Sequence, residues 1–302
     1  MIKRTIYFSN PARLSIKLDQ LLVQNKETGE ERQVPVEDIG FVILDHPQLT
    51  YTHAVLQKLS ANNCSVMVCD DKHLPAALIH PFQGNTIQNQ VYRNQLEASM
   101  PLQKQLWQQT IKAKITNQAL LLERLGKDGT SLKRFATQVK SGDTTNMEAR
   151  AAKVYWYRLF ELDSFRRERF GPAPNDQLNY GYAVLRAAVA RALAGSGLLP
   201  ALGIHHHNKY NAFCLADDIM EPYRPFVDNI VYGLWEAGDI DTYLSQENKM
   251  RLLEVLTCDI AINKMTSPLM VGLSQTTSSL VQCFTGQRKT VKYPKIPSAY
   301  AA

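Results

Sequence analysis

The chain of 302 residues has a formal net charge of +6, with 45% hydrophobic and 21% charged residues. This composition is typical of a globular protein with sizeable cores, and the length favours two domains. A membrane-spanning helix is excluded because no run of about 18 apolar residues occurs, and the first residues lack the apolar core of a signal peptide. The five cysteines form no CxxC pair and indicate reduced core residues of a cytoplasmic protein.

The first 80 residues are predicted to form a small, mostly antiparallel β-domain. Residues 14–18 alternate between apolar and polar, and residues 41–44 and 64–69 are apolar runs of strand length. A short helix is predicted at 52–62. None of these segments gathers the residue types of a catalytic cluster.

After a predicted linker at 81–87, the sequence changes to helical patterns rich in Gln, Leu, Lys and Ala. The predicted helices cover residues 88–125, 145–162, 176–195, 215–236, 245–262 and 266–284. They predict an all-helical domain over 88–285, followed by an extended basic tail over 286–302. The predicted fold class is therefore α+β, with a small β-rich N-terminal domain before a larger helical domain.

The positive charge is unevenly distributed along the chain. Residues 1–80 contain 8 Lys and Arg against 9 Asp and Glu, which leaves 26 against 19 in the remainder. An anionic partner is therefore expected to meet the second domain, and an excess of this size is compatible with a nucleic acid.

Three consecutive histidines, His205 to His207, are the least ordinary local feature of the sequence. Imidazole binds first-row metals and carries protons near neutral pH. The plain alternative is a surface loop in which histidines occur by chance.

Two carboxylates follow shortly after the histidines. Asp218 and Glu221 are three residues apart, so in a helix they share one face and repel each other unless a cation lies nearby. Mg²⁺ or Mn²⁺ could be that cation. Alternatively, Arg224 neutralises Glu221 in an ordinary salt bridge.

A third carboxylate, Glu148, has a structural alternative of its own. Thr145-x-x-Glu148 fits a capping box, in which the two side chains satisfy free amides at a helix start. That role would account for Glu148 without any catalysis.

These segments together resemble the CRISPR adaptation endonuclease and integrase family, which inserts spacers into CRISPR arrays. The matching motifs, in chain order, are Cys69-Asp70-Asp71-Lys72-x-Leu74-Pro75, Asn146-x-Glu148-x-x-Ala151-Ala152, Gly203-Ile204-His205-His206 and Leu215-Ala216-x-Asp218-Ile219-Met220-Glu221-Pro222-x-Arg224-Pro225. The first motif resembles members from type II systems. The likeness spans almost the whole chain, with Ala149 standing where many members have glycine.

The resemblance implies a catalytic metal site formed by Glu148, His206 and Glu221, binding Mg²⁺ or Mn²⁺. Asp218 and His205 are candidate additional ligands, because histidines flank His206 on both sides. The implied reaction is attack by a DNA 3′-hydroxyl on a phosphodiester, which needs no protein nucleophile. The implied partners are prespacer and repeat DNA, a second copy of the chain, the small second adaptation protein, and other proteins of the system such as the RNA-guided effector nuclease.

Basic residues around and after Glu148 are predicted to bind DNA phosphates, with neighbouring aromatics available to stack on unpaired bases. They are Arg150, Lys153, Arg158, Arg166, Arg167 and Arg169. The alternative is that the aromatics form a core and the cations its solvated face.

The sequence thus predicts a metal-dependent DNA integrase. Two other functions remain open: a non-catalytic helical DNA-binding scaffold, and a general metal-dependent nuclease that does not integrate DNA.

Overall fold

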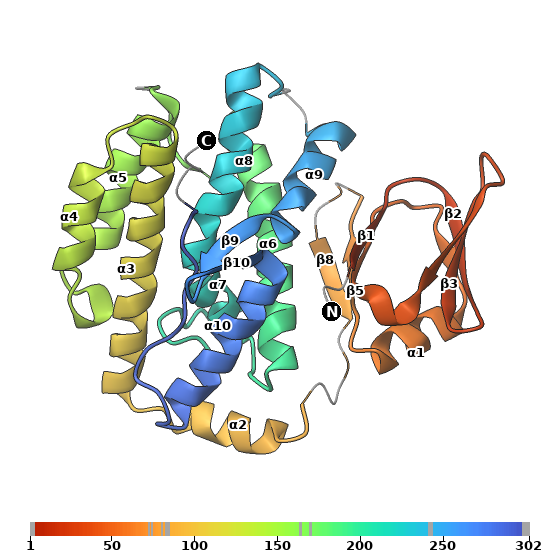
Figure 1. Cartoon of the computed structure of the whole chain (residues 1–302), viewed down its shortest axis with the longest axis horizontal. Coiled ribbons are helices and arrows are strands. Elements are labelled where there is room, and N and C mark those ends of the chain that lie inside the picture. The colour runs from red at the N-terminus through yellow and green to blue at the C-terminus, as the bar shows by residue number, and fades with distance from the viewer. Residues whose placement is uncertain are drawn as a thin grey trace. The chain divides into compact units, whose positions relative to one another are not determined.

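The computed structural model describes residues 4–71, 73, 75–79, 81, 85–162, 165–168, 171–240 and 244–297. The chain divides into two compact units, Met1–Thr86 and Ile87–Ala302. Residues 82–84 of the predicted linker lie outside the described residues. Figure 1 shows both units and labels most of their helices and strands.

The described residues of the first unit form two four-stranded sheets and one short α-helix. One sheet has the order β1 (Arg4–Phe8), β5 (Ile39–Leu44), β7 (Ser65–Cys69), β8 (Pro75–Ile79). The other has the order β4 (Glu31–Pro35), β3 (Gln20–Asn25), β2 (Ala12–Lys17), β6 (Thr50–Tyr51). Helix α1 (His53–Ala61) and the 3-10 turn η1 (Val36–Asp38) complete the unit.

The expectation of a mostly antiparallel domain is wrong for the first sheet. Strand β5 pairs in parallel with both β1 and β7, and only β8 is antiparallel. Parallel pairing needs long connections, and the second sheet and α1 provide them. Strand β5 has a strand on each side, and all six of its residues are buried.

The second unit is mainly helical. Its helices are α2 (Gln88–Leu96), α3 (Met100–Arg124), α4 (Thr130–Gln138), α5 (Met147–Phe160), α6 (Asn175–Gly195), α7 (Cys214–Met220), α8 (Arg224–Ala237), α9 (Gln246–Leu253) and α10 (Leu269–Phe284). The 3-10 turns among the described residues of this unit are η2 (Ser141–Asp143), η3 (Glu221–Tyr223) and η4 (Glu254–Leu256). None of the helices described is both long and apolar enough to cross a membrane.

The helical unit also contains a β-hairpin, so the prediction of an all-helical domain needs correction. Strands β9 (Asp259–Ile262) and β10 (Met265–Pro268) pair antiparallel, within the region predicted as two helices. Asn263 and Lys264 connect them, both with positive φ, which is the backbone of a tight two-residue hairpin turn. Ile260 and Ile262 point inward at the period of two that a strand requires.

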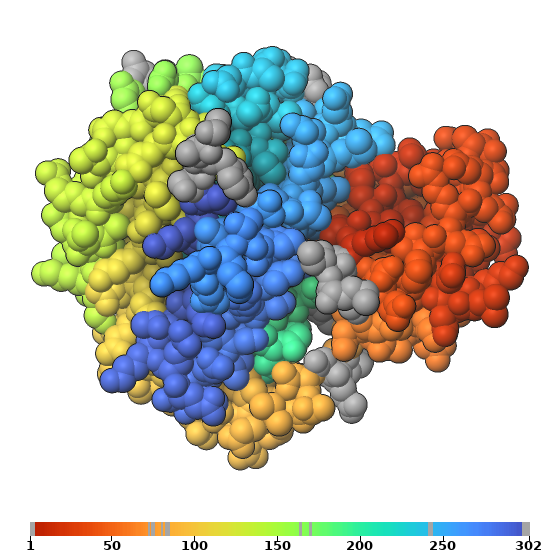
Figure 2. Space-filling view, in the orientation of Figure 1, coloured from red at the N-terminus to blue at the C-terminus, as the bar shows by residue number. Residues whose placement is uncertain are grey.

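The segment after α10, predicted as an extended basic tail, is packed on the helical unit as far as residue 297. Gln109 of α3 donates to the Lys289 carbonyl at 3.0 Å and accepts from the Val291 amide at 2.9 Å. Lys295 exchanges two backbone hydrogen bonds with Ala261, and Ile296 is buried. In Figure 2 the blue surface of this C-terminal region adjoins the yellow surface of α3. Residues 298–302 lie outside the described residues.

Candidate active site

Asp218 of α7 organises the histidine loop. Its fully buried carboxylate accepts hydrogen bonds from the backbone amides of Ile204 at 2.7 Å, His205 at 3.0 Å and His206 at 3.3 Å. Gly203 is required at the start of this turn, because a Cβ there would lie 2.3 Å from the His206 carbonyl oxygen. The Gly-x-x-His motif is therefore a loop wrapped around one buried carboxylate.

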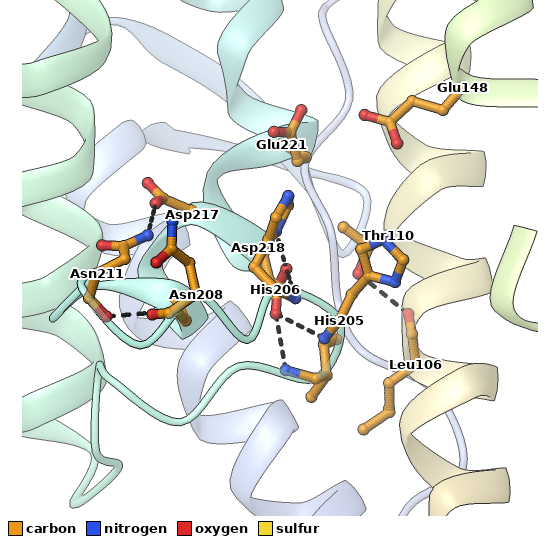
Figure 3. A network of polar contacts seen from close by, with 12 residues as sticks. Leu106, Thr110, Glu148, His205, His206, Asn208, Asn211, Asp217, Asp218 and Glu221 are labelled. Atoms are coloured by element: carbon orange, nitrogen blue, oxygen red, sulfur yellow. Dashed lines mark hydrogen bonds and ion pairs between the residues drawn. The ribbon is translucent and has the colours of Figure 1, made fainter. Parts of the chain in front are cut away.

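The same carboxylate orients the His206 ring. Asp218 Oδ1 lies 2.5 Å from His206 Nδ1, so the neutral ring carries its proton on Nδ1 and leaves Nε2 free as a ligand or base. Figure 3 shows the ring directed from Asp218 toward the carboxylates of Glu221 and Glu148. The hydrogen bond to Asp218 raises the pKa of His206 above its ordinary value.

His205 occupies a different environment. Its ring stacks on Trp107 of α3 with centroids 4.0 Å apart and planes 4° apart, while His206 meets the same indole edge-on at 5.6 Å. Burial lowers the pKa of His205. The structure therefore separates the two histidines by orientation, which the sequence could not do.

Glu148 and Glu221 meet at a shared cation, Lys114 of α3. The Lys114 ammonium lies 2.6 Å from Glu148 Oε1 and 2.5 Å from Glu221 Oε2. Glu221 is buried, and its other oxygen pairs with Arg224 at 2.9 Å, the salt bridge that the sequence left open. Burial opposes ionisation of Glu221, but Arg224 and Lys114 outweigh it and lower its pKa.

Glu148 does not serve the capping box that Thr145-x-x-Glu148 suggested. Asn146 is the N-cap of α5 and accepts from the Ala149 amide at 3.4 Å. Asp143 accepts from the Met147 and Glu148 amides at 2.9 and 3.0 Å. Because these two side chains satisfy the helix start, the Glu148 carboxylate is directed toward Lys114 instead.

Helix α3 supports the whole site, although sequence reasoning assigned it no functional residue. Trp107, Thr110, Lys114 and Asn117 follow one another at helical spacing of three or four residues. The Asn117 amide donates to the Pro222 carbonyl at 2.7 Å and to the Pro294 carbonyl at 3.0 Å. One face of α3 thus contacts the histidines, the two glutamates and the turn that follows Glu221.

A second buried carboxylate, Asp228 of α8, links three helices behind the site. Tyr155 of α5 donates to it at 2.7 Å, and Tyr182 of α6 donates to its other oxygen. The Arg224 guanidinium lies over the Tyr182 ring at 4.7 Å. Burial raises the pKa of Asp228 to about 6 despite both tyrosines. This cluster fixes Arg224, which in turn pairs with Glu221.

The predicted DNA-binding cations have different environments. Lys153, Arg150 and Arg166 are exposed, although Arg150 also packs over the Phe135 ring at 5.2 Å. Arg158 pairs with Asp128 at 2.8 Å.

Arg167 is directed into the protein. It donates to Asn175 at 3.0 Å and Asn179 at 2.7 Å and lies over the Tyr182 ring at 5.2 Å. Arg169 lies outside the described residues.

The donor types at the centre of the site fit a hard divalent cation. Two carboxylates and one imidazole nitrogen suit Mg²⁺ or Mn²⁺, and a cationic group already lies between the carboxylates. As the described side chains stand, however, no three His, Cys, Asp or Glu converge closely enough to share an ion.

Comparison with known proteins identifies the family. The family described as CRISPR associated protein Cas1 matches residues 6–257, which is most of the chain. The protein belongs to this family, and the resemblance predicted from the motifs is confirmed. A relative from Neisseria meningitidis serogroup C (strain 8013), named CRISPR-associated endonuclease Cas1, is 37% identical over 299 residues, covering 98% of this chain and 97% of the relative.

Solved structures share the fold. A casposase bound to an integration product matches with a TM-score of 0.78 at 19% identity, over 96% of this chain and 92% of that one. A chain of a Cas6-RT-Cas1–Cas2 complex matches with a TM-score of 0.72 at 20% identity, over 95% of this chain and 35% of that longer chain.

Proposed function

We propose that this protein is a metal-dependent DNA integrase that joins short DNA fragments to a CRISPR repeat through their 3′-hydroxyl ends. One observation carries the proposal. Glu148 and Glu221, from separate elements, converge on a single cation, and the His206 ring is directed at them (Figure 3). An arrangement in which one buried and one half-buried acid share a cationic centre beside an oriented imidazole is expected of a metal-dependent phosphodiester site.

Glu148, His206 and Glu221 would hold Mg²⁺ or Mn²⁺. When bound, such an ion neutralises charge on the phosphate and helps to activate the attacking oxygen and stabilise the leaving oxygen. Asp218 keeps the free His206 nitrogen directed at the site, and Arg224 keeps Glu221 ionised. No protein nucleophile is needed when a DNA hydroxyl attacks the phosphodiester.

The related proteins support the choice of partners. One structural neighbour is a casposase bound to an integration product, and another is a complex containing Cas1 and Cas2. We propose prespacer and repeat DNA as substrates, a Cas2-type protein and a second copy of this chain as partners, and the cytoplasm as the location. The RNA-guided effector nuclease of the system is a further proposed partner.

The test is incubation of the protein with a labelled short duplex and a plasmid containing the repeat, with Mn²⁺ or with a chelator, and with or without the Cas2-type partner. The proposal predicts labelled plasmid only when the metal is present. Metal-dependent cutting without joining would instead identify a general nuclease. Specific DNA binding with neither reaction, and no specific Mn²⁺ binding, would identify a scaffold.

A further inference from the structure

Lys114 is a buried cation with two anionic partners. Its side chain is only 12% exposed, and its ammonium contacts one oxygen each of Glu148 and Glu221. The lysine ammonium therefore places its positive charge between the two acids.

This position conflicts with the shared binding of a metal ion. A divalent ion held by Glu148 and Glu221 needs carboxylate oxygens that now contact the ammonium, and two cations cannot lie between the same acids without strong repulsion. Arg224 contacts the other Glu221 oxygen, so Glu221 has no oxygen free of a cationic contact.

We propose that Lys114 is an internal competitor of the divalent ion, which neutralises Glu148 and Glu221 in the metal-free protein and must withdraw before the ion binds. This inference rests on the proposed metal-dependent function and deepens it. When no metal is present, the ammonium keeps the two acids together, because the facing carboxylates would otherwise repel each other. It also lowers the apparent metal affinity, because only molecules in which Lys114 has withdrawn can bind.

The alternative role makes the opposite prediction. If Lys114 stayed in place and positioned the carboxylates for the ion, its removal would weaken metal binding. Methionine is the appropriate replacement, because it keeps an unbranched, flexible side chain of similar length and removes the charge.

The experiment is a titration of the full-length protein with Mn²⁺, in which electron paramagnetic resonance measures the free ion at each step. We expect Lys114→Met to bind Mn²⁺ at least about 10-fold more tightly than wild type, since the competing charge is gone. The melting temperature of the variant without metal should fall, and saturating Mn²⁺ should raise it by more than in wild type. Equal or weaker binding by Lys114→Met would overturn the proposal.

Two further variants complete the test. Lys112→Met removes a charge from the same helix, where no acid pairs with it in an ion pair of the described residues, and should leave Mn²⁺ affinity unchanged. If Lys114→Met does not fold, Lys114→Gln removes the charge while keeping a hydrogen-bond donor, and the same gain is expected.

A failure of the proposed metal site gives a different result from a failure of the competitor role. If Glu221→Gln leaves the Mn²⁺ affinity of the wild-type background unchanged, the metal site itself is misassigned. If Glu221→Gln abolishes binding but Lys114→Met brings no gain, only the competitor role is wrong.

Discussion

Asp218 shows how a residue's contacts restrict its role. From the sequence it is a candidate additional metal ligand, one helical turn from Glu221. In the structure its two oxygens accept three backbone amides and the His206 ring. A carboxylate with this many partners is better suited to orienting His206 than to binding an ion directly.

The glutamates should act as a unit. Glu148→Gln and Glu221→Gln should each slow DNA joining by at least about 100-fold, and the double variant should be little slower than either, because losing one ligand disables the shared site. Glu221→Gln should also lower the free energy of unfolding by about 3 kcal/mol or more, since Lys114 and Arg224 lose a buried partner. Joining rates and urea unfolding of the same samples measure both effects. Near wild-type joining by Glu148→Gln would rule out its role as a ligand.

The two histidines should differ sharply. His206→Ala should abolish joining, because its free nitrogen is directed at the glutamates (Figure 3). His205→Ala removes a ring stacked on Trp107 and should mainly reduce stability, by roughly 1 kcal/mol or more. Joining assays normalised to folded protein by circular dichroism separate these outcomes. Equal loss of joining in both variants would show that His205 also acts in the reaction.

Helix α3 and the β9–β10 hairpin show what the sequence could and could not predict. Periodicity located most helices, and the family motifs singled out Glu148, His206 and Glu221 as candidate ligands. Local pattern gave no sign of Lys114, which lies 34 residues before Glu148 and meets it only through helix packing. Because α3 is buried on more than one side, no single apolar stripe distinguished its functional face. The hairpin was missed because its short apolar strands also fit a helical pattern.

The packing of α5, α6 and α8 around Asp228 has a pH signature. Burial raises the pKa of this carboxyl to about 6, so the folded state binds a proton more readily than the unfolded chain does. Its contribution to stability is therefore largest at low pH and falls as pH rises through about 4 to 6.

The measurement is the difference in unfolding free energy between wild type and Asp228→Asn, from pH 4 to pH 7. Other titrating groups largely cancel in this difference, and asparagine does not ionise. Wild type should lose roughly 2 kcal/mol relative to the variant as pH rises. If the stability of wild type relative to Asp228→Asn stays constant or increases as pH rises, the assigned pKa is wrong.

The residues expected to set DNA affinity differ from those expected to carry out the reaction. The positive excess lies beyond residue 80, and Lys153 and Arg166 are exposed cations of the helical unit. Arg167, predicted from the sequence to bind phosphate, instead donates to Asn175 and Asn179 inside the protein. A count of basic residues could not reveal that difference, since it depends on which side chains the fold leaves exposed.

Salt dependence tests this separation. Lys153→Ala combined with Arg166→Ala should weaken binding to all DNA sequences and reduce the slope of log affinity against log salt by about 1 to 2. Arg167→Ala should lower thermal stability with little change in slope, and Glu221→Gln should bind DNA almost normally. Filter binding over a salt series supplies the slopes. An unchanged slope in the double variant would show that these two residues belong to a solvated face that does not contact DNA.

Whether this protein joins DNA through a 3′-hydroxyl can be decided by comparing two DNA ends. Two labelled duplexes, identical except that one ends in a 3′-hydroxyl and the other in a 3′-deoxy sugar, are incubated with the protein, its Cas2-type partner, Mn²⁺ and a repeat-containing plasmid. We predict labelled plasmid from the hydroxyl-ended duplex alone, because the hydroxyl supplies the attacking oxygen. Equal plasmid cutting with both duplexes, and label transferred from neither, would contradict the proposed joining reaction.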